Sequence, residues 1–125
     1  NFCNAEPQTI EHLLWKCQFI KRFWNALLNM LKEKCTHAHN LTLSETLIIF
    51  GLKDQTVTDS GLNKIILWAK FFIYKSKMQG VVPNFQAFVP ILKHRIAIEK
   101  YLAKVNGNEK RYTTTWNPYQ SLIDQ

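Results

Sequence analysis

Residues 18–34 read QFIKRFWNALLNMLKEK, and this stretch decides the fold class. Its large apolar residues recur at steps of three and four, the spacing of one face of an α-helix. They are Phe19, Ile20, Phe23, Trp24, Leu27, Met30 and Leu31. Lysine, arginine and asparagine occupy the other face. The stretch therefore predicts an amphipathic helix whose aromatic-rich face is buried in a core.

Similar spacing on both sides of this stretch predicts further helices. Thr9 caps a short helix over residues 10–15, and Ser44 caps a brief apolar helix over residues 45–50. A long helix begins at Asp59 or Ser60 and ends near Met78, before Gly80. Leu62, Ile65, Ile66, Ala69, Phe72 and Ile73 form one apolar face. Lys64, Trp68, Phe71 and Lys75 cluster on the other side, so we expect the helix to be sandwiched.

A last long helix is predicted over residues 85–104, with Asn84 as its cap. Pro90 removes one backbone hydrogen bond, so we expect the helix to bend or break there. Gly107 ends the helix. Residues 110–125 read as an irregular tail anchored by Trp116 and Tyr119.

No stretch alternates in the manner of a β-strand, so the predicted fold class is all-α with about four to five helices. A zinc-knuckle-like segment (1–17) precedes a helical domain (18–105) and a basic, aromatic tail (106–125). The composition agrees, because 125 residues with 46% hydrophobic content suffice for one core without disulfides. The apolar runs are far shorter than the roughly 20 residues of a membrane span. Neither a membrane helix nor a signal peptide is predicted, and the chain resembles a piece of something larger.

Charge is distributed unevenly along the chain. Up to residue 59 there are six basic and six acidic residues, whereas from residue 60 onward there are ten basic and three acidic ones. The formal net charge of +7 thus comes from the second half. This asymmetry is typical of proteins that bind nucleic acid or acidic membranes, although it also serves solubility. Three cysteines do not form a secreted disulfide framework and favour a reducing, intracellular location.

The most specific motif lies at the N-terminus, where Cys3, His12 and Cys17 form a Cys-x8-His-x4-Cys pattern. Thiolates and an imidazole are ligands that zinc prefers, and a structural site takes four ligands. Alternatively, His12 and Cys17 are half-buried packing residues. Cys35, His37 and His39 form a second cluster that could bind a metal or donate one ligand. The simpler interpretation is a buried thiol and two solvated imidazoles.

The string from Cys3 to Cys17, followed by Phe23 and Trp24, resembles the cysteine-rich zinc-knuckle region of non-LTR (LINE-type) retrotransposon reverse transcriptases. That region has a Cys-x2-Cys…Thr-x-x-His-Leu…Cys…Trp pattern near the C-terminal end of the polyprotein. The resemblance implies zinc bound by Cys3, His12 and Cys17, with a further cysteine expected just upstream. It also implies RNA or DNA and the upstream reverse transcriptase core as partners, and a ribonucleoprotein found in cytoplasm and nucleus.

Basic residues suggest where nucleic acid would bind. On the helix after Pro90, three lysines fall within about 40° of one another and form a stripe expected to face solvent. Ile91, Ile98, Leu102 and Val105 lie opposite, on the side expected to face the core. On the preceding helix Lys64 and Lys75 flank the ring of Trp68, and the tail adds two further cations. The candidate nucleic-acid-binding residues are therefore Lys64, Trp68, Lys75, Lys93, Lys100, Lys104, Lys110 and Arg111. Core packing is the alternative for Trp68 and Phe71, and we expect His94 to be a packing residue. We expect Glu99 to pair locally with Arg95.

The sequence is compatible with three functions for this chain. The first is a nucleic-acid-binding module that helps hold template RNA or target DNA during target-primed reverse transcription. The alternative is a helical protein-interaction module that docks on the polymerase core, with its basicity serving solubility. A separate enzyme is not expected, because the chain has no nucleophile–base pair, phosphate loop or carboxylate cluster. Neither a membrane partner nor a small-molecule substrate is expected.

Overall fold

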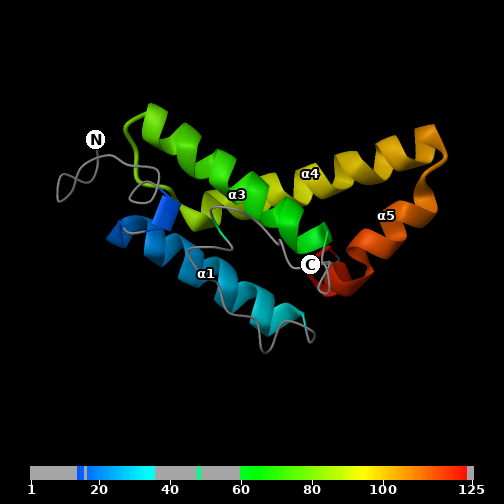
Figure 1. Ribbon diagram of the computed structural model, residues 1–125, viewed down its shortest axis with the longest axis horizontal. Coiled ribbons are helices and arrows are strands. Elements are labelled where there is room, and N and C mark those ends of the chain that lie inside the picture. The colour runs from blue at the N-terminus through cyan, green and yellow to red at the C-terminus, as the bar shows by residue number, and fades with distance from the viewer. Residues whose placement is uncertain (1–13, 16, 36–47, 49–59, 124–125) are drawn as a thin grey trace.

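The structure is a computed structural model and describes residues 14–15, 17–35, 48 and 60–123. Within these ranges the regular elements are all helices, as predicted. They are α1 (Gln18–Lys34), α3 (Ser60–Met78), α4 (Phe85–Asn106), α5 (Glu109–Trp116), the 3₁₀ turn η3 (Asn117–Tyr119) and α6 (Gln120–Ile123). Figure 1 shows α4 extending beyond the end of α3, with α5 folding back from the end of α4 toward the body of the molecule.

Helix α1 confirms the prediction made from its periodicity. Ile20, Phe23, Trp24, Leu27 and Leu31 are all buried. The ring of Phe23 lies 5.5–5.8 Å from four other aromatic rings, those of Trp24, Phe72, Phe85 and Phe88. One aromatic cluster therefore joins α1 to α3 and α4.

Helix α4 has the predicted residues at both of its ends. Asn84 accepts a hydrogen bond from the backbone N–H of Gln86 at 2.9 Å, and Gly107 ends α4 with a left-handed φ of 74°. Pro90 does not break α4, contrary to one of the two expected outcomes. Pro90 lies on the exposed surface together with Gln86, whose carbonyl would have accepted the missing bond, so water can satisfy that carbonyl.

The apolar face predicted for α3 is buried, but Phe71 on the other side of this helix is 53% exposed, so within the described residues the expected sandwich is wrong. The core face expected for α4 is wrong as well. Leu62, Ile65, Ile66, Ala69 and Ile73 are buried, whereas Phe72 is half-buried. In α4 the buried residues are Phe88, Leu92, Ile96 and Ala103. The four residues expected there are exposed: Ile91, Ile98, Leu102 and Val105. His94, expected in the packing, is exposed as well.

The C-terminal segment is helical where an irregular tail was expected. Tyr112, Trp116 and Tyr119 follow steps of four and three, and this helical face packs into the core. Trp116 and Tyr119 are almost fully buried, which confirms both as anchors. The hydroxyls of Thr113 and Thr114 donate to the carbonyls of Glu109 and Lys110, both at 3.0 Å, so the threonines bond within the helix.

The predicted helices over 10–15 and 45–50 lie largely outside the described residues, as do the cap residues Thr9 and Ser44. Among the residues described there, Ile48 is fully buried in the core. In the described part of the chain, no helix combines the length and the apolar character needed to cross a membrane.

Candidate nucleic-acid interface

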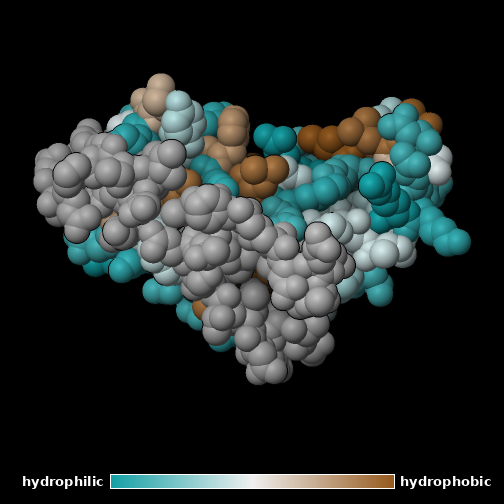
Figure 2. All heavy atoms as spheres, in the orientation of Figure 1, coloured by the Kyte–Doolittle hydropathy of each residue, from teal (hydrophilic) through white to brown (hydrophobic). Residues whose placement is uncertain are grey.

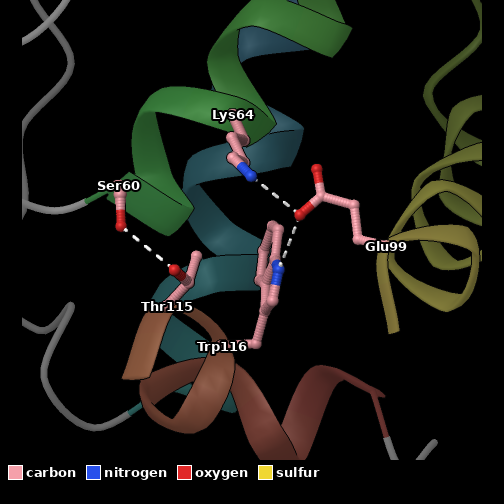
Figure 3. Close-up of polar contacts among 5 residues, drawn as sticks. All are labelled: Ser60, Lys64, Glu99, Thr115 and Trp116. Carbon is pink, nitrogen blue, oxygen red and sulfur yellow. Dashed lines mark hydrogen bonds and ion pairs between the residues drawn. The ribbon is translucent and has the colours of Figure 1, made fainter. Parts of the chain in front are cut away.

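Lys64, the first of the predicted cations, is part of a partly buried polar network where α3, α4 and α5 meet. Its Nζ lies 2.8 Å from Oε1 of Glu99, and the same oxygen accepts a hydrogen bond from the indole Nε1 of Trp116 at 3.2 Å. Figure 3 shows these three side chains converging from α3, α4 and α5, with Ser60 and Thr115 beside them. Glu99 therefore pairs with Lys64 and not with Arg95 as expected. This pairing offsets the charge that Lys64 would offer to a phosphate.

Trp68, predicted as a base-stacking ring, is half-buried and already stacked within the fold. Its ring lies 5.8 Å from that of Trp116, with 14° between the planes. The exposed edge of Trp68 helps line a groove of about 220 Å³ between α3 and α4. Packing, the alternative interpretation, thus accounts for most of the Trp68 surface.

Two cations among the described residues line the groove, and only one of them, Lys75, is predicted from the sequence to bind nucleic acid. Lys75 lines it from α3, with its ammonium 5.8 Å from the centre of the Phe71 ring, and Arg95 lines it from α4. From the sequence, Arg95 is expected to pair with Glu99. Its position four residues after Ile91 could have indicated that both side chains line the groove, because residues at that spacing share a side of a helix.

Three lysines of α4 share a flank of that helix, as their spacing requires. Lys100 and Lys104 are exposed, while Lys93 is half-buried and engaged in a further interaction. Lys100 and Lys104 are therefore the members of this set most available to a partner. On α3, burial lowers the pKa of Lys70, which favours its neutral form.

Helix α5 presents the remaining predicted cations. Lys110 and Arg111 are both exposed. Arg111 also lines a cleft of about 590 Å³ that it shares with Lys64 and Glu99. Hydroxyl and amide side chains line it as well, namely Ser60, Asn106, Asn108, Thr114 and Thr115, together with Leu102, Ala103 and Tyr112. The predicted cations thus occupy several parts of the surface: Lys75 the groove, Lys64 and Arg111 the cleft, and Lys93, Lys100 and Lys104 the flank of α4.

The predicted zinc ligands are described only in part. Cys17 is buried, with 2% of its surface exposed, at the N-terminal end of α1. Cys3 and His12 lie outside the described residues, as do His37 and His39 of the second cluster. Cys35 is buried at the other end of α1. Among the described residues, no group of three metal-ligating side chains is assembled.

Comparisons with known proteins add no assignment: no protein-family model matches the chain, and neither curated proteins nor solved structures give a match.

Proposed function

We propose that this chain is a nucleic-acid-binding module from the C-terminal region of a LINE-type retrotransposon reverse transcriptase and endonuclease. It would help hold template RNA or target DNA while the upstream polymerase copies RNA from a nick. The motif from Cys3 to Trp24 supports the family, and the charge of the second half supports the activity. The proposed location is a ribonucleoprotein in cytoplasm and nucleus.

The observation that carries the proposal is the balance of charge on the described C-terminal helices. Residues 60–123 contain ten basic side chains and two acidic ones, Glu99 and Glu109. Glu99 is bonded to Lys64 and Trp116, so it neutralises little of the exposed positive charge. A surface with this excess attracts phosphates and releases counterions when it binds them.

The residues best suited to contact phosphates are the exposed cations Lys100, Lys104, Lys110 and Arg111. Beside Arg111, the cleft offers hydroxyl and amide groups, which often contact phosphate and sugar. We leave Trp68 out of this set because its ring is stacked on Trp116. The module would therefore bind the backbone and read little sequence.

A zinc ion would stabilise the N-terminal segment. Cys3, His12 and Cys17, with a ligand from upstream, would supply the thiolates and imidazole of a structural site. Such a site contributes to folding and leaves chemistry to other parts of the polyprotein. The chain itself would be non-catalytic.

The test is a salt titration of binding to a fluorescent single-stranded RNA. With three to four phosphate contacts, the plot of log affinity against log salt should have a slope of about −2 to −3, at roughly −0.7 per contact. The double variant Lys100→Glu/Lys104→Glu should reduce the magnitude of that slope by about 1.4. The matched control is Lys21→Glu/Arg22→Glu, which reverses two exposed charges on α1. Equal slopes for the two double variants, or no binding by the wild type at low salt, would overturn the proposal.

A further inference from the structure

Helix α4 carries a row of exposed apolar side chains on the flank opposite its lysines. Ile91, Ile98, Leu102 and Val105 have 41–62% of their surface exposed. We call these four residues the α4 seam. They fall within about 60° of one another, and about 150° away from Lys100 and Lys104. Figure 2 shows hydrophobic surface along the upper edge of the molecule, over the C-terminal half of α4 in Figure 1.

The spacing of the seam is that of a coiled-coil helix. Ile91, Arg95, Ile98, Leu102 and Val105 are separated by steps of four, three, four and three, which place them at alternating d and a positions of a heptad. An apolar stripe this narrow fits one partner helix, because helices that bury a face in a core or at a membrane surface use a stripe of about 100° or more. The seam is about 21 Å long, at 1.5 Å per residue.

Cations border the seam, so a partner that binds there would be stabilised by acidic side chains. Arg95 lies within it and, with Lys75 and Phe71, lines the groove beside Ile91. At the other end Arg111 lines the cleft that Leu102 also lines. Glu99, the acidic residue of α4, is bonded to Lys64 and Trp116. A second copy of this chain would place like charges across the contact, and a nucleic acid would gain nothing from aliphatic side chains.

We infer that the α4 seam binds an amphipathic α-helix of another protein, with apolar residues at heptad spacing and acidic residues beside them. The apolar residues of that helix would pack on Ile98 and Leu102. Its carboxylates would pair with Arg95 and Lys75 at one end and Arg111 at the other. The seam lies on the flank opposite the α4 lysines, and of the cations proposed to contact phosphates this contact shares Arg111. It does not depend on the proposed nucleic-acid binding.

The test uses three designed helical peptides of about three heptads, measured by fluorescence anisotropy with the whole chain. The first has leucine at the a and d positions and glutamate at e and g. The second replaces these glutamates with lysines, and the third has the composition of the first with its apolar residues scrambled. We expect the first peptide to bind at least about tenfold more tightly than the other two.

Variants of the chain locate the contact. Ile98→Ser/Leu102→Ser removes two exposed apolar side chains without changing charge, and should weaken the glutamate peptide at least about tenfold. Arg95→Glu should shift preference toward the lysine peptide. The matched control, Lys100→Glu/Lys104→Glu, alters the opposite flank and should leave peptide binding within about twofold. Ile98→Ser alone, away from the cleft that Leu102 and Arg111 line, should in turn leave RNA binding unchanged, so the two proposals fail or succeed separately.

Four results would overturn the inference. They are no preference for the glutamate peptide, unchanged peptide binding in Ile98→Ser/Leu102→Ser, a wild-type dimer that this variant abolishes, and binding to anionic phospholipid vesicles that it abolishes. The dimer would identify a second copy as the occupant, and the vesicle result would identify a membrane surface. Sedimentation of the chain alone and with vesicles distinguishes them.

Discussion

The indole of Trp116 donates a hydrogen bond to Glu99 at 3.2 Å, which joins the C-terminal segment to the middle of α4. Trp116 is fully buried, so its N–H has no access to bulk water as a substitute acceptor. Lys64 binds the same carboxylate oxygen, but 41% of its side chain is exposed. The two bonds to Glu99 should therefore differ in their contributions to stability.

We predict that Glu99→Leu destabilises the protein by about 1–3 kcal/mol, the cost of an unsatisfied buried donor. Glu99→Gln keeps an oxygen acceptor for Trp116 and loses the ion pair, so it should cost less than about 1 kcal/mol. Lys64→Met should behave like Glu99→Gln. Urea denaturation of the three variants checks this order. Equal losses in Glu99→Leu and Lys64→Met would show that the ion pair, and not the indole bond, is the main contribution.

The second prediction concerns Gly61, at the point where α3 meets the C-terminal segment. A Cβ atom there would lie 2.6 Å from a ring carbon of Tyr119 and 2.9 Å from the carbonyl oxygen of Thr115. Helix propensity alone predicts that Gly61→Ala gains about 1 kcal/mol. The clash predicts a loss of about 1–3 kcal/mol, because Tyr119 is buried and the carbonyl belongs to the backbone. The sign of the change in the free energy of unfolding decides between them.

The core position of Trp24 gives a third prediction. Its ring is 2% exposed, and its indole N–H donates to the carbonyl of Leu14 at 2.7 Å. Trp24→Ala should cost about 3–5 kcal/mol and lower the melting temperature sharply or prevent folding. Tyr101→Ala is the control, because 67% of this aromatic residue is exposed and its loss should change stability by less than about 0.5 kcal/mol. Similar melting temperatures for the two variants would contradict the assigned core.

How far the sequence predicts the fold depends on how many apolar stripes a helix carries. Helix α1 has one stripe backed by polar residues, so its buried face followed from spacing alone. Helix α4 has two, and near its C-terminal end the larger aliphatic side chains, those of Leu102 and Val105, belong to the exposed stripe, whereas the buried one has Ala103. Its core face includes Glu99, a polar residue accepted there because Trp116 and Lys64 bind it. Those partners lie 17 and 35 residues away in sequence, so local spacing gave no sign of them.

The candidate site was predictable as a set of charges but not as a geometry. Counting residues located the basic half, and Lys100, Lys104, Lys110 and Arg111 are indeed exposed. The contacts of Lys64 and Trp68 depend on how the C-terminal segment returns to α3. Three consecutive threonines, which are weak helix formers, concealed the Tyr112–Trp116–Tyr119 face that brings this segment back.

The zinc proposal predicts different behaviour for two buried cysteines at opposite ends of α1. Cobalt added to the reduced chain, extended upstream to include the expected fourth ligand, should give thiolate-to-cobalt absorption. Cys17→Ser should remove this band. Cys35→Ser should keep it, although both thiols are equally buried at 2% exposure. A band that is lost in neither variant, or in both, would exclude this ligand set.

The last prediction follows from contacts to the phosphate backbone. The exposed cations of α4 and α5 belong to long, mobile side chains, and the proposed site has no element that enters a groove to reach base edges. Two unrelated RNAs of equal length, and a DNA strand of the same length, should therefore bind with affinities within about threefold of one another, because all three present the same phosphate charge. Lys100→Glu/Lys104→Glu should weaken all three by the same factor, as read from anisotropy titrations at one salt concentration. If the wild type prefers one RNA by more than about tenfold, and the variant loses that preference, these lysines read bases or RNA shape, and the backbone-binding account is wrong.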